Sequence, residues 1–103
     1  MGRRPMSEAP PNDRSMKARE SLGLVTPFVP PQSEVQATVC GIYSEHLRVA
    51  PVGIDDEFFD LGGDSFTAVQ ISLAIEVATG LQVDSGEIER LASVRAVAAL
   101  AER

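Results

Sequence analysis

Apolar side chains recur at helical spacing in two long stretches of this chain and in a shorter one near its end. In the first stretch an apolar residue falls every three or four positions: Val35, Val39, Ile42, Tyr43 and Leu47. This period puts them on one face of a helix. Ser33-Glu34-Val35-Gln36 has the order of a capping box, which satisfies the first N–H groups of a helix. The pattern therefore predicts a helix over about residues 34–48.

The second stretch predicts a helix over residues 65–79 that ends at Gly80. Its apolar residues fall into two stripes along the helix. One stripe contains Ala68, Ile71, Ile75 and Ala78, and the other contains Phe66, Val69, Leu73 and Val77. A surface helix of a small domain needs only one buried stripe. The second stripe predicts either a deeply buried helix or a face kept for a partner.

A short helical piece over residues 84–91 and a last helix capped by Ser93 complete the pattern. The last helix points four residues inward, namely Val94, Val97, Ala98 and Leu100. No segment shows the alternating β-branched residues that are typical of a strand. The predicted fold is all-α, a small bundle of three longer helices and one short helix.

Residues 49–64 form a long loop between the first two helices. Its apolar residues, Ile54, Phe58, Phe59 and Leu61, indicate that the loop packs onto the body. Asp55 is expected to cap a short helical turn over residues 56–60. The acidic residues here do not have the spacing of a calcium-binding EF-hand loop, so they are interpreted as solvated side chains and no metal site is expected.

Residues 1–32 are predicted to be a flexible, proline-rich extension, and residues 33–103 the folded domain. Six of the seven prolines fall in the first segment. Within it, the apolar run Leu22-Gly23-Leu24-Val25 is able to dock on the body. The extension carries a net charge of +2 and the domain one of −8. An acidic domain argues against nucleic-acid binding and favours partners with basic surfaces.

The chain has one cysteine, Cys40, and one histidine, His46. A disulfide framework is therefore excluded and an all-protein zinc site is not expected, and a lone cysteine fits a reducing cytoplasm. No segment has the roughly 18 apolar residues of a membrane span. We expect a cytoplasmic protein that is monomeric and does not contact membranes.

The turn Gly62-Gly63-Asp64-Ser65 is the stretch most suggestive of chemistry. Gly62 and Gly63 permit positive φ and the close approach of another molecule, and Asp64 can cap the helix that follows. Ser65 then lies where backbone N–H groups are unpaired and the helix dipole is positive, which favours a phosphate ester on its hydroxyl. A plain helix cap explains the same four residues, and on local pattern alone it is the simpler interpretation.

Catalytic interpretations of Ser65 are weaker. A Gly-x-Ser-x-Gly elbow is absent because Thr67 stands two residues after the serine. A Ser-His-Asp triad would require His46, and nothing in the sequence links that histidine to Ser65. A phosphate-binding P-loop would need a lysine after its glycines.

The wider pattern resembles the acyl carrier protein superfamily, and within it the peptidyl or aryl carrier proteins of nonribosomal peptide synthesis. The resemblance covers about residues 30–101. The resemblance is strongest over Val52-Gly53-Ile54-Asp55-Asp56-Glu57-Phe58-Phe59-Asp60-Leu61-Gly62-Gly63-Asp64-Ser65. Two further stretches also resemble the family, Gly80-Leu81 and Ala92-Ser93-Val94-Arg95-Ala96-Val97. The combination is far more specific than the glycine pair alone.

This resemblance implies a four-helix carrier whose Ser65 receives 4′-phosphopantetheine from coenzyme A, with Gly63 and Asp64 beside the attachment point. A separate magnesium-dependent phosphopantetheinyl transferase would make the transfer, and the thiol of the arm would hold an aminoacyl or acyl group as a thioester. Further implied partners are an adenylating (loading) enzyme and condensation, ketosynthase or tailoring enzymes. Phe66, Val69 and Leu73 match positions that face such partners. The chain itself is then not an enzyme.

Four residues depart from the usual pattern of that family. Asp64 stands where many peptidyl carriers have histidine, and Phe66 replaces a commoner leucine. Glu89 and Ala92 replace an apolar residue and a proline, which puts the course of the third helical piece in question. Three hypotheses follow: a freestanding carrier, which the proline-rich start favours; a carrier domain cut from a larger synthetase; and an acidic helical interaction module without a prosthetic group.

Overall fold

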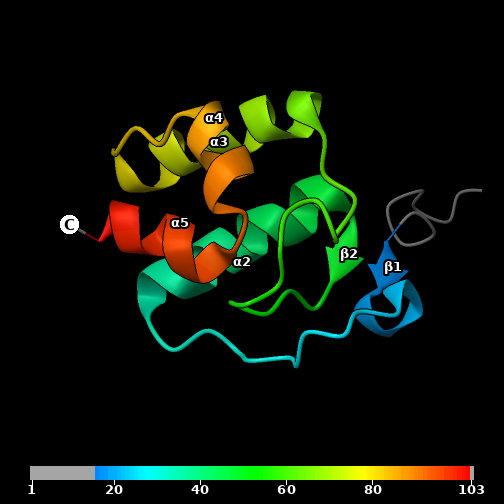
Figure 1. Ribbon diagram of the computed structural model, residues 1–103. Coiled ribbons are helices and arrows are strands. Elements are labelled where there is room, and N and C mark those ends of the chain that lie inside the picture. The colour runs from blue at the N-terminus through cyan, green and yellow to red at the C-terminus, as the bar shows by residue number, and fades with distance from the viewer. Residues whose placement is uncertain (1–15, 103) are drawn as a thin grey trace, which may run out of the picture.

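The computed structural model describes residues 16–102, and four α-helices make up most of this part of the chain (Figure 1). They are α2 (Glu34–Leu47), α3 (Ser65–Thr79), α4 (Ser85–Leu91) and α5 (Val94–Ala101). Helix α2 packs against α3 and α5, and α4 contacts both of these helices. The predicted all-α bundle with a long packed loop is confirmed, although α5, with 8 residues, is barely longer than α4, with 7.

The predicted cap of α2 is present in a modified form. The Ser33 Oγ accepts a hydrogen bond from the Gln36 N–H at 3.1 Å, as a capping box requires. The Gln36 Oε1 accepts from the N–H of Gln32, at 2.8 Å, one residue before the expected partner. Helix α2 ends at Leu47, and Arg48 follows it in the left-handed conformation with φ of 60°.

The core lies between α2, α3 and α5 and includes the loop before α3. Phe58 of that loop is fully buried, with its ring edge-on to Tyr43 at 6.1 Å between centroids. On α3 the stripe of Ala68, Ile71 and Ile75 faces the core, and each of these side chains is buried. The prediction for Ala78 was wrong: it is exposed because it lies in the last turn, beyond the last buried residue of α3.

The loop acids do not behave as the sequence suggested. Asp56 is fully buried, so its interpretation as a solvated side chain is wrong. Its carboxylate is accommodated in the interior because it receives two hydrogen bonds from Arg19, which lies 37 residues away in the sequence. Asp55 pairs with Arg95 at 2.7 Å and does not cap a helix; no helix forms over residues 56–60, where Glu57 forms an isolated bridge with Ser93 and residues 58–60 form a turn.

Within the described residues, residues 17–29 lie against the helical body, although the sequence predicted a flexible extension there. Two short strands, β1 (Lys17–Ala18) and β2 (Val49–Ala50), pair in parallel, and the 3₁₀-helix η1 (Arg19–Leu22) follows β1. Leu22, Leu24 and Val29 pack against the core. Two-residue strands are too short to produce the alternation by which sequence reveals a strand. Residues 1–15 of the predicted extension lie outside the described residues.

Among residues 16–102, no helix is both long enough and apolar enough to cross a membrane.

Candidate functional site

Phe58 anchors the loop that leads to the candidate serine. Its N–H donates to the Ala92 carbonyl at 2.8 Å, which ties the loop to the junction of α4 and α5. Its own carbonyl accepts the N–H of Gly63 at 3.0 Å. A Cβ added to Gly63 would overlap the Phe58 ring. Gly63 is therefore required by packing inside the chain, whereas Gly62, with φ of 98°, supplies the predicted positive φ.

Asp64 caps α3 through a reciprocal pair of hydrogen bonds. Its Oδ1 accepts the N–H of Thr67 at 2.9 Å, and the Thr67 Oγ1 accepts the N–H of Asp64 at 2.9 Å. The bond from the Thr67 N–H, followed by the bond from its hydroxyl, lowers the pKa of the Asp64 carboxyl below its ordinary value. The sequence missed the role of Thr67, although its place three residues after the capping aspartate was a usable signal.

Ser65 is the first residue of α3, and it is exposed. It lies where the first N–H groups of a helix lack partners within the helix and the dipole is positive. A phosphate ester on its hydroxyl would therefore meet favourable electrostatics without displacing a packed side chain. The residues present fit a phosphate-linked prosthetic group: an accessible hydroxyl, a fixed helix start and a preceding turn held in place by Phe58.

The second stripe of α3 starts directly beside Ser65 and is exposed along the helix. The exposed fractions are 70% for Phe66, 48% for Val69, 58% for Leu73 and 87% for Val77. Of the two sequence alternatives, a buried helix or a face kept for a partner, these fractions favour the face. The three positions predicted to meet partners, Phe66, Val69 and Leu73, thus lie on one exposed apolar stripe that begins next to Ser65.

The helical piece that the sequence left in question, α4, is a regular short helix. Glu89 is half-buried on it, and its end is marked by Ala92 with φ of 69°. The Ser93 N–H bonds to the Leu91 carbonyl at 2.7 Å across Ala92, which makes a γ-turn of a rare, strained form. Proline cannot adopt this positive φ. The backbone at Ala92 therefore has a conformation that the proline usual at this position in the family could not take.

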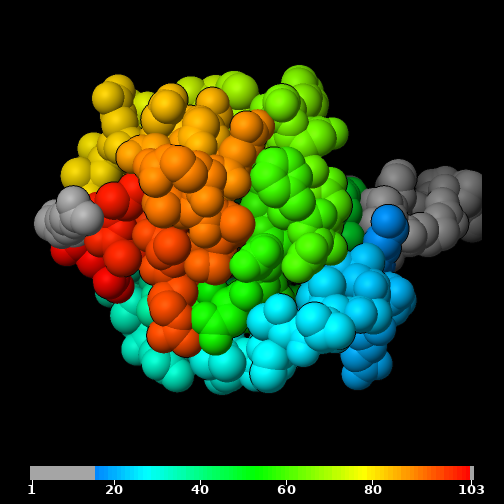
Figure 2. All heavy atoms as spheres, in the orientation of Figure 1, coloured from blue at the N-terminus to red at the C-terminus, as the bar shows by residue number. Residues whose placement is uncertain are grey.

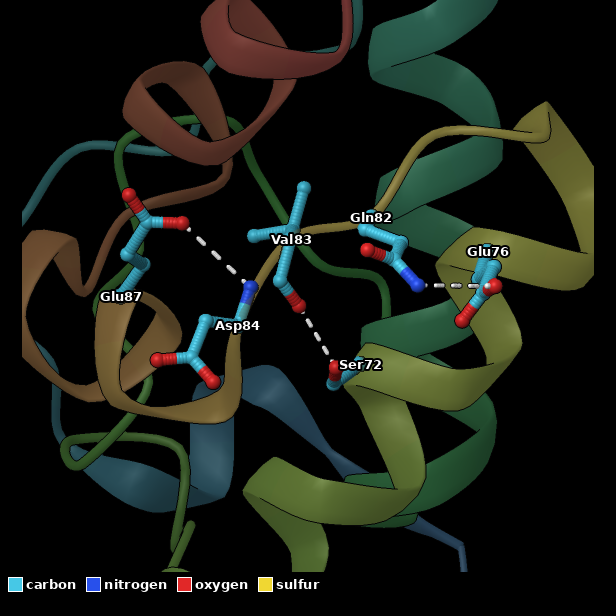
Figure 3. Close-up of a pocket in the computed structure, with 6 residues that line it drawn as sticks. All are labelled: Ser72, Glu76, Gln82, Val83, Asp84 and Glu87. Atoms are coloured by element: carbon cyan, nitrogen blue, oxygen red, sulfur yellow. Dashed lines mark hydrogen bonds between the residues drawn. The ribbon is translucent and has the colours of Figure 1, made fainter.

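A polar groove of about 340 Å³ lies between α3 and α4 (Figure 3). Its lining residues are Ser72, Glu76, Gln82, Val83, Asp84 and Glu87. The Glu87 Oε1 accepts the Asp84 N–H at 3.3 Å, and the Ser72 hydroxyl donates to the Val83 carbonyl. The first contact caps α4, and the second holds the segment before α4 against α3. Among the described residues, no cluster of three or more His, Cys, Asp or Glu is arranged to hold a metal ion.

Cys40 and His46 lie away from Ser65 in the chain, on α2. Burial raises the pKa of the Cys40 thiol to about 11, so this buried thiol is not a thiolate nucleophile at neutral pH.

Comparison with known proteins also points to a phosphate-linked prosthetic group on this chain. Residues 37–101 match the family model described as "Phosphopantetheine attachment site". Over 73 residues, 71% of this chain, the sequence is 44% identical to a dimodular nonribosomal peptide synthase of Bacillus subtilis (strain 168). The chain spans only 1–3% of the length of the curated synthases that it matches.

Two solved structures share both fold and sequence with this chain. One, described as a "Non Ribosomal PCP domain", superposes with a TM-score of 0.65 and 30% identity, covering 70% of this chain and 92% of that one. The other, described as "McyG A-PCP complexed with phenylalanyl-adenylate", gives a TM-score of 0.66 and 29% identity, covering 71% of this chain and 12% of that one. The chain therefore belongs to the phosphopantetheine-bearing carrier protein family, in the peptidyl carrier branch found in nonribosomal peptide synthases.

Proposed function

We propose that Ser65 is the attachment point of the family's 4′-phosphopantetheine group. The observation that carries this proposal is the position of Ser65: an exposed hydroxyl at the first residue of α3, next to an exposed apolar stripe. The family match spans this serine. The prosthetic group, when bound, supplies a flexible thiol on which an aminoacyl or acyl group is held as a thioester.

The attachment step needs no base or metal from this chain. The Ser65 Oγ forms a new bond to the β-phosphorus of coenzyme A, and the phosphoanhydride bond breaks to release adenosine 3′,5′-bisphosphate. The proton of the serine hydroxyl passes to a base of the phosphopantetheinyl transferase, which also provides the magnesium ion. The exposed Asp64 carboxylate, adjacent to Ser65 and kept ionised by its lowered pKa, is suited to help position that ion.

We also propose that the chain acts as substrate and partner of other enzymes rather than as a catalyst. Phe66, Val69 and Leu73 supply an apolar contact surface, and the net charge of −8 over residues 33–103 favours partners with a basic rim. One similar structure is an A-PCP with phenylalanyl-adenylate, which supports loading from an acyl adenylate made by an adenylating enzyme. Condensation, ketosynthase or tailoring enzymes would then receive the thioester.

The lone, buried Cys40 fits a cytoplasmic location for this chemistry. That the carrier is freestanding stays a prediction from the sequence.

The experiment is incubation of the full chain with coenzyme A, magnesium and a broad-specificity phosphopantetheinyl transferase, followed by intact-mass measurement. We expect a mass increase of one phosphopantetheinyl group on the wild-type protein and none on Ser65→Ala. Ser85→Ala is a matched control, because Ser85 is also the first residue of a helix and also follows an aspartate. An unchanged wild-type mass would favour the alternative function, an acidic interaction module that binds its partner equally well with Ser65→Ala.

A further inference from the structure

Asp56 is a carboxylate buried in the body of the carrier. It is 0% exposed and lies in the loop that precedes α3. Its two oxygens accept three hydrogen bonds: from the Arg19 Nε at 2.6 Å, from the Arg19 Nη2 at 2.6 Å, and from the Gly53 N–H at 2.8 Å. Burial of a carboxylate is strongly unfavourable without such compensation. The only positive charge in this set comes from Arg19, on the segment before α2.

The Arg19 side chain has further contacts besides those with Asp56. Its Nη2 also donates to the Thr26 carbonyl at 2.7 Å, and its guanidinium lies 5.3 Å from the centre of the Phe28 ring. Only 13% of the side chain is exposed. The planar fork of arginine therefore joins three partners at once: the body through Asp56, and its own segment through Thr26 and Phe28.

Backbone contacts join the same segment to the body at both ends. At one end, the Lys17 N–H donates to the Arg48 carbonyl at 2.8 Å. At the other, the Ile54 N–H donates to the Val29 carbonyl at 2.9 Å, and a Cβ on Gly53 would press on Phe28 and Val29. Figure 2 shows the blue and cyan residues of this segment packed directly against the green loop.

We propose that residues 17–29 are a structural strap, and that the surface formed by Asp56, the Gly53 and Ile54 backbone and the edge of β2 is a binding site for it. The chemistry of the site selects a segment that carries one arginine, which here opens the 3₁₀-helix η1. The folded unit of this carrier therefore begins at or before Lys17, and not at Ser33. The family match, which begins at residue 37, does not include the strap.

Asp55, the neighbour of Asp56, provides a matched comparison. Asp55 also accepts two hydrogen bonds from one arginine, from the Arg95 Nε at 2.7 Å and the Arg95 Nη2 at 3.0 Å. Both side chains of that pair are exposed, 36% for Asp55 and 53% for Arg95. Exposed pairs contribute little to stability, whereas removing one partner of a buried pair leaves an uncompensated charge.

The strap and the serine loop have separate anchors. Gly53, Ile54 and Asp56 contact the strap, whereas Phe58 is tied to Ala92 and Gly63 to Phe58. Helix α3 lies on the far side of α2 from the strap (Figure 1). Loss of the strap contact is therefore expected to leave the presentation of Ser65 intact, so this proposal and the attachment proposal fail independently.

The test is urea unfolding of the full chain. The test variants are Arg19→Gln, Asp56→Asn and the two combined. The control variants are Arg95→Gln alone and Arg95→Gln combined with Asp55→Asn. We expect Arg19→Gln to raise the unfolding equilibrium constant about a hundredfold, and Arg95→Gln by at most about fivefold. The Arg19→Gln/Asp56→Asn variant should recover part of the loss, because it no longer buries an unpaired charge. Equal, small effects of Arg19→Gln and Arg95→Gln would overturn the proposal.

Hydrogen exchange on the wild-type chain keeps the proposal testable even where Arg19→Gln does not fold. The Lys17 and Ile54 amides should exchange as slowly as amides inside α2. Exchange of these two amides at the rate of an unstructured peptide would overturn the proposal. In folded Arg19→Gln, exchange should rise more at Lys17 and Ile54 than at Phe58 and Gly63, which share only the global loss of stability, while modification of Ser65 keeps its wild-type rate. A uniform rise across all four amides would contradict a local strap.

Discussion

Two helices of this domain begin with the same dipeptide. Asp64-Ser65 opens α3 and Asp84-Ser85 opens α4, and in both cases the aspartate precedes the first helical turn and the serine is the first helical residue. Both starts also have a side chain three residues later that accepts the N–H of the aspartate, from Thr67 at 2.9 Å and from Glu87 at 3.3 Å. Local chemistry therefore does not separate the two serines.

Their surroundings do separate them. Ser65 follows a turn packed on Phe58 and is the first residue of a 15-residue helix with an exposed apolar stripe. Ser85 is half-buried, opens a 7-residue helix and adjoins the polar groove between α3 and α4. If Ser65 is the attachment point, as we propose, the features that set it apart from Ser85 are the packed preceding turn, the accessible hydroxyl and the exposed apolar stripe.

The two faces of α3 provide the largest contrast, between the exposed apolar stripe and the core. Ile75→Asp places a carboxylate in the core and should destabilise the fold by about 4 kcal/mol or more, enough to remove most helical circular dichroism from a marginal domain. Leu73→Asp on the exposed stripe should cost only about 0.5 kcal/mol, the difference in helix propensity.

Turnover by a loading enzyme is the second measurement that compares the two faces of α3. We expect Leu73→Asp, and likewise Phe66→Asp, to lower turnover about tenfold or more while helical circular dichroism is retained. Loss of helicity in Leu73→Asp would instead assign that stripe to the core. Wild-type turnover in both exposed variants would remove the stripe from the partner surface.

The glycines beside the two Asp-Ser pairs should respond in opposite directions. Gly63→Ala forces a methyl group into the Phe58 ring and should destabilise the fold by about 1–3 kcal/mol in urea unfolding. Gly86→Ala, on the exposed surface of α4, should be neutral or stabilising by up to about 1 kcal/mol, because alanine favours the helix. A Gly63→Ala variant as stable as wild type would show that the turn before Ser65 is not fixed by Phe58.

The smallest expected effect concerns the charge of Asp64. Because the folded-state pKa of this carboxyl is lowered, its ionised form contributes stability above the ordinary pKa of about 4, and that contribution is lost as the pH falls through the folded value. Asp64→Asn keeps an acceptor for the cap but removes the titration. The difference in urea midpoint between the two proteins should therefore be small at pH 7 and should vanish as acidification protonates Asp64 in the folded state. A difference that does not change with pH would contradict this assignment.

The helices were largely predictable because each depends on contacts that are local in sequence. The spacing of apolar residues predicted α3, Gly80 predicted its end, and Ser33 and Ser93 predicted the starts of α2 and α5. Their caps confirm the prediction, since each serine accepts the N–H three residues on.

Contacts between distant residues were not predictable in the same way. Asp55 and Asp56 are adjacent and chemically identical, yet one is exposed beside Arg95 and the other is buried against Arg19. The need for Gly63 to contact Phe58 is equally a tertiary effect. For the site, the proposal of Ser65 as the attachment point came from the sequence and the family resemblance, and the second stripe of α3 was also visible there, whereas the anchoring of the turn required the structure.

Localisation of the modification within one wild-type molecule tests the central claim most directly. After incubation with coenzyme A and a phosphopantetheinyl transferase, the protein is digested and the peptides are sequenced by tandem mass spectrometry. Ser65 and Ser85 compete as otherwise similar helix starts in the same sample. We predict that the phosphopantetheinyl group is found on Ser65 alone. Its presence on Ser85, or on neither serine, would contradict the assignment of the α3 start as the attachment site.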